Sequence, residues 1–336
     1  MPTRSVITIG NFDGVHAGHA ALIRRAHELA NLANLANPAP PPTRVIAVTF
    51  DPHPLTVLKP GAEPARITTF DRKAALLRAL GAAEVVRLTP DDATLNSSPE
   101  QFVDRLVREY APVAFVEGPD FRFGRARAGD IRTLAALGTA RDPQSRFRVE
   151  VVEPVQVALC DHTLVTASSN LVRWMLEHGR VRDAASLLGR PHVIDGLVER
   201  GERRGRTIGW STANLRAETI APGDGVYAGI ARLEDGRRFP AAISIGTKPT
   251  FGDRERAVEA VLLDANHPRP VTLPGLPEYG WRLSLHLLGW IRDQVRFASV
   301  ADLTDQIARD AVRALAITSE SDQAAAPAAR AERASA

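Results

Sequence analysis

The sequence predicts an α/β domain with a Rossmann-like, doubly wound parallel sheet, followed by a small closed β-barrel. In the first half, short β-branched runs alternate with stretches of helical spacing, which is typical of a parallel sheet covered by helices. After Leu188 the helical spacing stops, and short strands separated by turns take over. We therefore expect domains at 1–188 and 189–318. From about Ser319 the chain lacks large hydrophobic residues, which predicts a disordered tail at 319–336.

Composition favours a globular protein of a reducing compartment. The chain of 336 residues is 44% hydrophobic and 24% charged, and its single cysteine, Cys160, excludes an internal disulfide framework and a thiolate metal cluster. The first strand begins too early for a signal peptide, and no apolar run approaches membrane-spanning length, so we expect a cytoplasmic protein. With a net charge of only +3 and scattered arginines, small anions are better expected partners than nucleic acid or membranes. The sequence leaves open whether the chain forms a weak homo-oligomer.

The elements of the first half follow from the spacing of apolar residues and from the proline and capping residues at element ends. The first strand, 6–9, leads into a helix through Ala33, and the prolines at 38–42 predict a solvent-exposed loop. The capping box Ser98-Pro99-Glu100-Gln101 predicts a helix start. Further strands are expected at 44–50, 84–88, 112–116, 147–152 and 164–166, and further helices at 71–80, 130–137 and 167–179.

The second half contains strand patterns that can bury their apolar faces only by closing on one another. Asp235-Gly236 predicts a hairpin turn, and Ser299 predicts the cap of a final helix with Leu303, Ile307 and Val312 on one face. Strands are expected at 193–199, 225–233, 239–245, 258–264 and 281–288.

The first candidate site is the run Gly10-Asn11-Phe12-Asp13-Gly14-Val15-His16-Ala17-Gly18-His19, which lies between the first strand and the first helix. The carboxyl edge of an open α/β sheet is where ligands bind, and free N–H groups at a helix start attract anions. His16 and His19 are three residues apart, so they share a side if the helix begins early, and their N–H groups can donate to phosphate oxygens. The alternative is that these residues only make a turn and cap a helix.

This run resembles the HxGH signature of the nucleotidyltransferase superfamily, and its longer form resembles the first motif of the bacterial bifunctional riboflavin kinase/FMN adenylyltransferase family. The segment Asp51-Pro52-His53-Pro54 resembles the second motif of that family. The loop 117–125, with two acids, two aromatic residues and two arginines, resembles a third motif at the flavin and nucleotide site. A plain turn and a solvated surface are the alternatives for these two segments.

The segment Ser168-Ser169-Asn170-Leu171-Val172-Arg173 resembles the Ser-Ser-Thr-x-x-Arg motif of the superfamily. It departs from the pattern at Asn170, where threonine is usual, and at Leu171, where this family has arginine. Ser169 and Arg173 match. A helix N-cap explains the serines equally well.

In the second half, 205–214 resembles the riboflavin kinase motif Gly-x-Pro-Thr-Ala-Asn, with Ser211 in place of proline. The resemblance implies that Thr212 and Asn214 bind ATP and Mg²⁺. The run 245–252 resembles the next motif, and 258–264 resembles the strand of the catalytic glutamate, which makes Glu259 the candidate base. Arg292 and Phe297 match the flavin-side motif, whereas Gln294 and the proline-rich segment 266–278 depart from it.

The resemblance covers the chain from Val6 to about Ala316. It implies that the barrel of the second half is of the six-stranded type, and it implies a role for each matching residue. The implied catalytic residues are His16, His19 and Glu259. The implied nucleotide-binding residues are Gly10, Asn11, Phe12, Asp13, Gly18, Ser169, Arg173, Gly205, Thr212 and Asn214. The implied flavin-binding residues are Asp51, Pro52, His53, Asp120, Phe121, Phe123, Arg292 and Phe297.

The function implied is a two-step synthesis of FAD with Mg²⁺ in both steps: the barrel phosphorylates riboflavin with ATP to FMN, and the first domain adenylylates FMN and releases diphosphate. One rival is a nucleotidyltransferase for another phosphate acceptor, such as a pantetheine or glycerol derivative, which the kinase-like barrel disfavours. A second rival is a flavin- or nucleotide-binding regulator, or a homologue that keeps one activity, as Asn170, Leu171 and Ser211 suggest. Turnover distinguishes an enzyme from a regulator.

Overall fold

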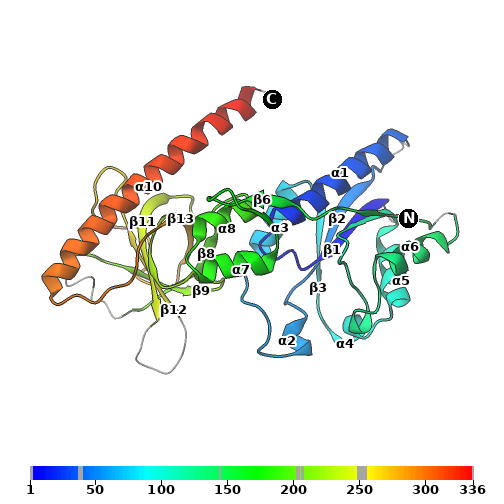
Figure 1. Cartoon of the computed structure of the whole chain (residues 1–336), viewed down its shortest axis with the longest axis horizontal. Coiled ribbons are helices and arrows are strands. Elements are labelled where there is room, and N and C mark those ends of the chain that lie inside the picture. Colours follow the sequence, from blue (N-terminus) through cyan, green and yellow to red (C-terminus); the bar gives the residue numbers. More distant parts are fainter. Residues whose placement is uncertain are drawn as a thin grey trace. The chain divides into compact units, whose positions relative to one another are not determined.

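The structure is a computed structural model that describes residues 3–36, 41–143, 145–201, 205, 208–247 and 256–334. It forms two compact units, one of Met1–Pro64, Phe70–Ala158 and Thr163–Ser169, and one of Ala65–Thr69, Leu159–His162 and Asn170–Ala336. The first unit holds an open sheet and the second a closed barrel (Figure 1). Parts of four sequence predictions lie outside the described residues, namely those at 38–40, 206–207, 248–252 and 335–336.

The first unit is built on a five-stranded parallel sheet with the order β3-β2-β1-β4-β5. Its strands are β1 (Ser5–Gly10), β2 (Arg44–Phe50), β3 (Glu84–Leu88), β4 (Pro112–Glu117) and β5 (Arg148–Val151). The order reverses at β1, since β2 and β3 lie on one side of it and β4 and β5 on the other. Such a reversal opens a crevice at the carboxyl edge of the sheet, where ligands of α/β proteins bind.

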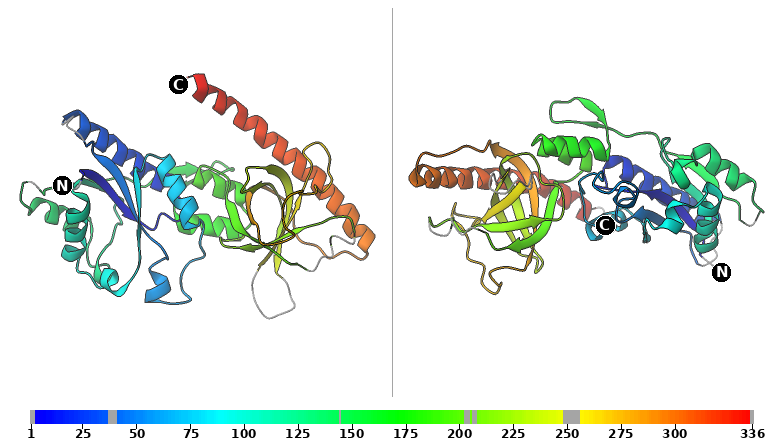
Figure 2. Two further views of the ribbon diagram at one scale, coloured as in Figure 1. Left: turned by 180° about the vertical axis from the view of Figure 1, so that it is seen from behind. Right: turned by 90° about the horizontal axis from the view of Figure 1, so that it is seen from below.

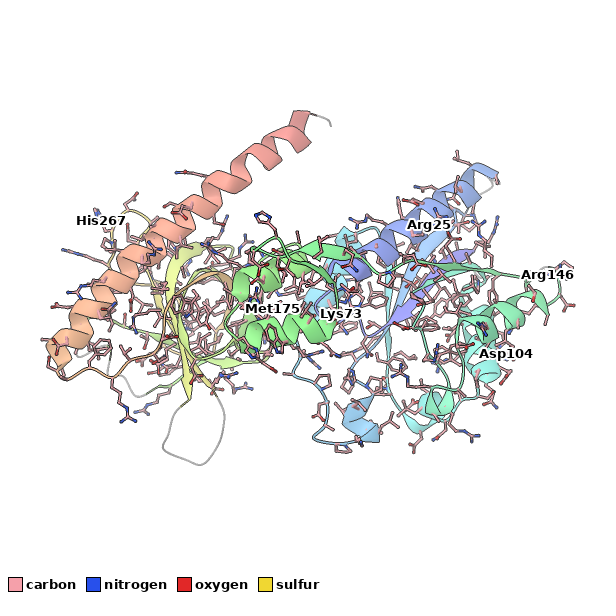
Figure 3. All side chains as sticks on the ribbon, viewed as in Figure 1. Arg25, Lys73, Asp104, Arg146, Met175 and His267 are labelled. Carbon is pink, nitrogen blue, oxygen red and sulfur yellow. The ribbon has the colours of Figure 1, made fainter. Side chains whose placement is uncertain are left out.

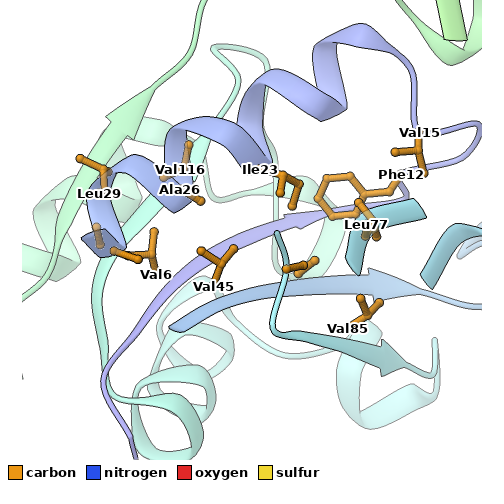
Figure 4. Close-up of a cluster of buried hydrophobic side chains, with 14 of the residues drawn as sticks. Val6, Phe12, Val15, Ile23, Ala26, Leu29, Val45, Leu77, Val85 and Val116 are labelled. Carbon is orange, nitrogen blue, oxygen red and sulfur yellow. The ribbon is translucent and has the colours of Figure 1, made fainter. Parts of the chain in front are cut away.

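Helices cover both faces of this sheet, as the sequence predicts. One hydrophobic cluster joins α1 (Ala17–Ala36) and α3 (Phe70–Ala79) to one face through Ile23, Ala26 and Leu77 (Figure 4). A second cluster joins α5 (Pro99–Tyr110) and α6 (Ile131–Thr139) to the other face. The expected capping box at Ser98 is present, with both of its hydrogen bonds. Three single-turn elements, α2 (Leu55–Leu58), α4 (Asp92–Leu95) and η1 (Arg125–Arg127), lie in the connections.

One predicted strand does not join the sheet. The segment 164–166 forms β7 (Leu164–Thr166), which pairs antiparallel with β6 (Gln156–Ala158) in a separate two-stranded sheet. The end residues of both strands are exposed and only the central ones are half-buried. Without a buried face, this hairpin has no hydrophobic surface with which to extend the main sheet.

The second unit contains most of α7 (Ser169–Glu177), all of α8 (Val181–Leu188) and a closed antiparallel barrel (Figure 2). Helix α8 ends at Gly189, whose φ of 68° is the left-handed conformation that glycine adopts readily, so helical structure stops where the sequence predicts it. The barrel order is β10-β11-β12-β9-β8-β13. The strands are β8 (Val193–Glu199), β9 (Ala213–Ala217), β10 (Gly225–Leu233), β11 (Arg238–Thr247), β12 (Arg256–Leu262) and β13 (Arg282–Arg292).

A long helix, α10 (Val300–Ala334), follows the barrel and packs against β10, β11 and β13. Ala311, Ala314 and Ile317 are buried with Ala228 and Val261 of the barrel. The tail expected to be disordered from residue 319 differs in the structure, where the helix continues to Ala334. Alanine, glutamate, glutamine and arginine have high helix propensity, so this composition extends a helix that packing has already started.

Candidate active sites

The loop between β1 and α1 is shaped by two buried hydrophobic residues. Phe12 and Val15 are 1% and 3% exposed and belong to the same cluster as the helix behind them. Both have positive φ, 47° and 44°, next to Gly14 at 83°, and the Val15 N–H donates to the Phe12 carbonyl. Left-handed conformations at non-glycine residues persist only where the surroundings enforce them. The burial of these two side chains therefore fixes the course of the loop.

The two histidines of the motif lie together, as their spacing predicts. The rings of His16 and His19 stack with centroids 3.7 Å apart and an interplanar angle of 25°, and the rings of Phe12 and His19 form a T-shaped pair. The Gly18 N–H donates to Nδ1 of the buried His16 at 3.2 Å. In a neutral ring this leaves the proton on Nε2, which can then donate to a ligand.

Gly18 is needed between the histidines for space. A Cβ at this position would lie 3.1 Å from Cε1 of His16, which is closer than ordinary van der Waals contact. A larger residue would therefore displace the ring that the loop holds.

The end of β2 meets this loop at the same sheet edge. Asn11 Nδ2 lies 3.1 Å from Nε2 of His53, and His53 Nδ1 accepts the N–H of Leu55. The Asp51 carboxylate is buried and paired with Arg87, whose guanidinium also lies 4.4 Å above the ring of Phe70. The peptide bond between Asp51 and Pro52 is cis. The structure thus brings the first two motifs together, and flavin binding by Asp51, Pro52 and His53 stays a prediction.

The loop after β4 contains the residues predicted to hold the flavin ring. Phe123 is 6% exposed and packs in the core, and the half-buried Phe121 stacks on it with ring centroids 5.4 Å apart. Asp120 is exposed. Of these three side chains, Phe121 and Asp120 are the more accessible to a ligand.

The motif at 168–173 is divided between the two units. Ser169 Oγ donates to the carbonyl of Asp13 at 2.8 Å, so this serine fixes the backbone of the first motif at Asp13. In the second unit, the guanidinium of the buried Arg173 donates to the Ala65 carbonyl at 2.7 Å and to Asn170 Oδ1 at 3.1 Å. The amide oxygen of Asn170 thus accepts a hydrogen bond from the very arginine that the motif retains.

Two buried ionisable residues at the sheet edge were not among the candidates from sequence. Glu117 at the end of β4 is 1% exposed and accepts the N–H of Ile9 at 2.8 Å. Burial raises the pKa of its carboxyl well above the usual value. Lys73 on α3 is 5% exposed and is also bound at this edge. In the sequence, Glu117 stands out only as an acid of the loop 117–125, and no local pattern distinguishes Lys73 from other helix residues.

The barrel holds two neighbouring cavities that share Thr212 and Asn214. One has a volume of about 690 Å³ and is also lined by Ser211, Glu278 and Tyr279. The other has a volume of about 450 Å³. Its lining includes the predicted residues Gly205, Glu259, Arg292 and Phe297. The shared residues therefore stand where a ligand in one cavity would meet a ligand in the other.

Strand register places Glu259 beside Asn214. Glu259 of β12 lies directly opposite Asn214 of β9 on one side and Ser244 of β11 on the other. Directly opposite residues of antiparallel strands point to the same face, so the three side chains line one cavity. The sequence gives no strand at 213–217 and no role for Ser244, because both depend on the pairing.

The flavin-side residues of the barrel are fixed by α10. Nε and Nη2 of Arg292 donate to the buried carboxylate of Asp310 at 2.9 and 2.7 Å, and the Arg292 guanidinium lies over the Phe297 ring. Gln294, where the family has an acid, donates to Ser244 Oγ at 2.8 Å and to the Ile245 carbonyl at 3.1 Å. An ionised carboxylate could accept but not donate, so the amide makes contacts that the acid cannot.

Among the residues that the structure describes, no three His, Cys, Asp or Glu side chains form a group able to hold a metal ion. Mg²⁺ does not require such a cage, since it keeps several waters and binds substrate phosphates through few protein oxygens. The Thr212 hydroxyl and the Asn214 amide are hard oxygen donors where the two cavities meet, so they suit such an ion.

Comparisons with known proteins agree with this architecture. The family model for FAD synthetase matches residues 1–162, and the model for riboflavin kinase matches residues 188–318. The chain is thus a two-domain transferase of flavin nucleotide synthesis.

Relatives match nearly the whole chain. A bifunctional riboflavin kinase/FMN adenylyltransferase of Escherichia coli (strain K12) is 34% identical over 313 residues, covering 92% of this chain and 91% of the relative. The protein of the same name from Bacillus subtilis (strain 168) is 31% identical, covering 91% and 90%. The chain therefore belongs to the bifunctional riboflavin kinase/FMN adenylyltransferase family, whose members are bifunctional enzymes of FAD biosynthesis.

A solved structure, titled as a macrolide-efflux protein from Streptococcus pneumoniae, superposes with a TM-score of 0.74 at 27% identity and covers 92% of this chain and 93% of its own. In the described part of the present chain, no helix is long and apolar enough to cross a membrane. The resemblance in fold extends over both units.

Proposed function

We propose that the barrel of this chain transfers the γ-phosphoryl group of ATP to riboflavin, and that the N-terminal domain transfers the adenylyl group of a second ATP to the FMN so formed. The observation that carries the proposal is the pair of adjoining barrel cavities with Thr212, Asn214 and Glu259 where they meet, because phosphoryl transfer needs two ligands in line. We place the domains at 1–188 and 189–318, in accordance with the sequence prediction, and we propose a cytoplasmic location.

In the kinase step, Glu259 takes the proton of the primary alcohol of riboflavin as the alcohol oxygen attacks the γ-phosphorus of ATP and ADP leaves. Thr212 and Asn214 hold the phosphates and would hold Mg²⁺, which supplies neutralisation of phosphate charge when bound. Arg292 and Phe297 border the flavin, and Asp310 keeps the Arg292 guanidinium in one orientation.

In the adenylyl transfer, an FMN phosphate oxygen attacks the α-phosphorus of ATP and diphosphate leaves, without a covalent enzyme intermediate. His16 and His19 donate hydrogen bonds to phosphate oxygens as negative charge grows on them. The hydrogen bond from Gly18 to Nδ1 of His16 supports this role, since it leaves Nε2 to donate. Residues of the loop from Gly10 to Asp13 position the triphosphate, and Asp51, His53 and Phe121 border the flavin.

The test is chromatographic analysis of the products that the purified chain makes from MgATP with riboflavin or with FMN. We expect FAD from both substrates. FMN without FAD from riboflavin would show that the departures at Asn170 and Leu171 have removed the second activity. No product from either substrate, together with binding of flavin or ATP, would favour a regulator.

A further inference from the structure

The geometry points to Lys73 as a positioning residue for adenylyl transfer, one that ties the first motif to the end of β2 and holds the phosphate-binding loop in its working shape. This inference rests on the adenylyl transfer proposed above. Lys73 lies outside every motif that the sequence resembles, and the resemblance gives it no role.

Lys73, labelled in Figure 3, belongs to α3 and is 5% exposed, and its ammonium reaches the carboxyl edge of the sheet. Its Nζ donates to the carbonyl of Asn11 at 2.9 Å, to Oγ1 of Thr49 at 3.2 Å and to the carbonyl of Phe50 at 3.3 Å. One ammonium group thus binds the loop after β1 and the last two residues of β2.

The carbonyl of Asn11 is held twice, because it also accepts the hydroxyl of Thr49 at 3.0 Å. Two donors on one carbonyl fix the plane of the peptide between Asn11 and Phe12. The side chain of Asn11 in turn lies 3.1 Å from His53 Nε2, so the contact extends into the second motif. Lys73 and Thr49 together therefore determine how both motifs approach a ligand.

The choice of lysine supports a specific role. Only 3 of the chain's 42 basic residues are lysines, and the other two, Lys59 and Lys248, lie in other segments. A compact ammonium has three donors that can turn toward three acceptors, whereas the planar guanidinium of arginine has its donors in a fixed fork. Burying a full charge is costly, so retaining one here indicates that the charge or its geometry is used.

Holding the loop affects the chemical step more than the binding of substrate. Displacing a phosphate-binding loop by about 1 Å lowers a rate about 10²-fold, because the reacting groups are no longer aligned. Phe121, which borders the flavin in the proposed mechanism, comes from the loop after β4, so the affinity for FMN is less affected than the alignment of the phosphates. The signature of a positioning residue here is a loss of kcat with a nearly constant KM.

The test compares Lys73→Met with Arg78→Met, which removes an exposed cation from the same helix. In the full-length protein, Lys73→Met should lower the kcat of FMN adenylylation about 10²-fold and change KM for FMN less than about threefold. The riboflavin kinase rate of the same sample should stay unchanged. Arg78→Met should leave both activities at the parent level.

Two further variants guard against misfolding as the explanation. Thr49→Val keeps the shape of the residue and the charge of Lys73 but removes one donor to the Asn11 carbonyl, so kcat should fall about tenfold. Lys73→Cys in a Cys160→Ser background, alkylated with 2-bromoethylamine, restores an ammonium on a stem of nearly the same length and should recover kcat.

Adenylylation by Lys73→Met within about threefold of the parent kcat would overturn the inference, as would a loss confined to KM. Equal losses in Lys73→Met and Arg78→Met would also contradict it. If the unaltered chain makes no FAD from FMN, the proposed adenylyl transfer itself is wrong, whatever the variants do. The two failures are therefore distinguishable.

Discussion

At the residue scale, the most informative contacts are those that fix the protonation or orientation of a side chain. His16 accepts the Gly18 N–H at Nδ1 and stacks on His19, so the ring has one orientation, and its proton in the neutral form lies on Nε2. Electrostatic stabilisation by such pre-oriented donors requires no reorganisation when charge develops on the phosphates. The loop that contains the two histidines thus orients their rings.

The substitution His19→Ala should lower kcat for FMN adenylylation about 10²- to 10³-fold, the usual loss when one such donor is removed. His16 would also lose the ring on which it stacks. The measurement is the initial rate of diphosphate release from FMN and MgATP. The kinase rate of the same preparation is the control, and adenylylation at the parent rate would remove His19 from the mechanism.

Glu117 predicts a dependence of stability on pH. Its folded-state pKa is raised by burial, so the folded chain holds this proton more tightly than the unfolded chain. The stabilisation from the protonated form is complete below the unfolded pKa and is lost as the pH rises through the folded pKa. Glu117→Gln keeps an acceptor for the Ile9 N–H and cannot ionise.

The free energy of unfolding of Glu117→Gln, relative to the parent, should therefore increase as the pH rises above about 5, by at most about 1.4 kcal/mol per pH unit. Urea denaturation at several pH values measures it. Glu153→Gln, at an exposed position, controls for the loss of one negative charge. A difference that is flat with pH would mean that burial does not hold the Glu117 proton.

At the scale of elements, α10 completes the flavin side of the barrel. Its Asp310 is buried. The Asp310 carboxylate accepts hydrogen bonds from Nε and Nη2 of Arg292 and from the side-chain amide of Gln306. Leu303 and Ile307 from the same helix line the smaller cavity. A helix that follows the barrel in sequence thus builds part of its binding surface.

Replacing Asp310 with alanine should destabilise the chain by about 2 to 3 kcal/mol, because Arg292 keeps a largely buried charge without its carboxylate. Thermal unfolding is the measurement. Asp305→Ala, an exposed acid on the same helix, should change stability by less than about 0.5 kcal/mol. If Arg292→Ala, Asp310→Ala and the double variant show additive losses, the pair contributes no coupling.

At the scale of the whole molecule, each step has its own site, and FMN is the product of one and the substrate of the other. The substitution Glu259→Gln should abolish FMN formation while leaving adenylylation of supplied FMN. His19→Ala should have the opposite effect. Neither variant alone should convert riboflavin efficiently to FAD.

An equimolar mixture of the two variants should restore FAD formation from riboflavin, since FMN released by His19→Ala can be adenylylated by Glu259→Gln. Chromatography of the products against time, with each variant alone as the control, measures this. A mixture that accumulates only FMN would show that the adenylylation site of Glu259→Gln is damaged, and a mixture that makes neither product would contradict separate assignments.

The sequence by itself determined most strands of the sheet and barrel, the end of helical spacing at Leu188 and the residues of the motifs. These features depend on local information, namely hydrophobic spacing, capping residues and turn residues. The nearness of the histidines was expected from their spacing on an early helix, but His16 lies just before α1 and is held by the Gly18 N–H. Glu259 was assigned by resemblance, and its role stays a prediction.

Only the tertiary structure decided what depends on contacts distant in sequence. The register of three strands places Asn214, Glu259 and Ser244 on one face, and packing at the sheet edge buries Lys73 and Glu117. A lysine on an amphipathic helix is expected in solvent unless a distant segment supplies acceptors. The β6–β7 hairpin and the full length of α10 were missed for the same reason, since burial, and not local propensity alone, decides which segments pair or continue.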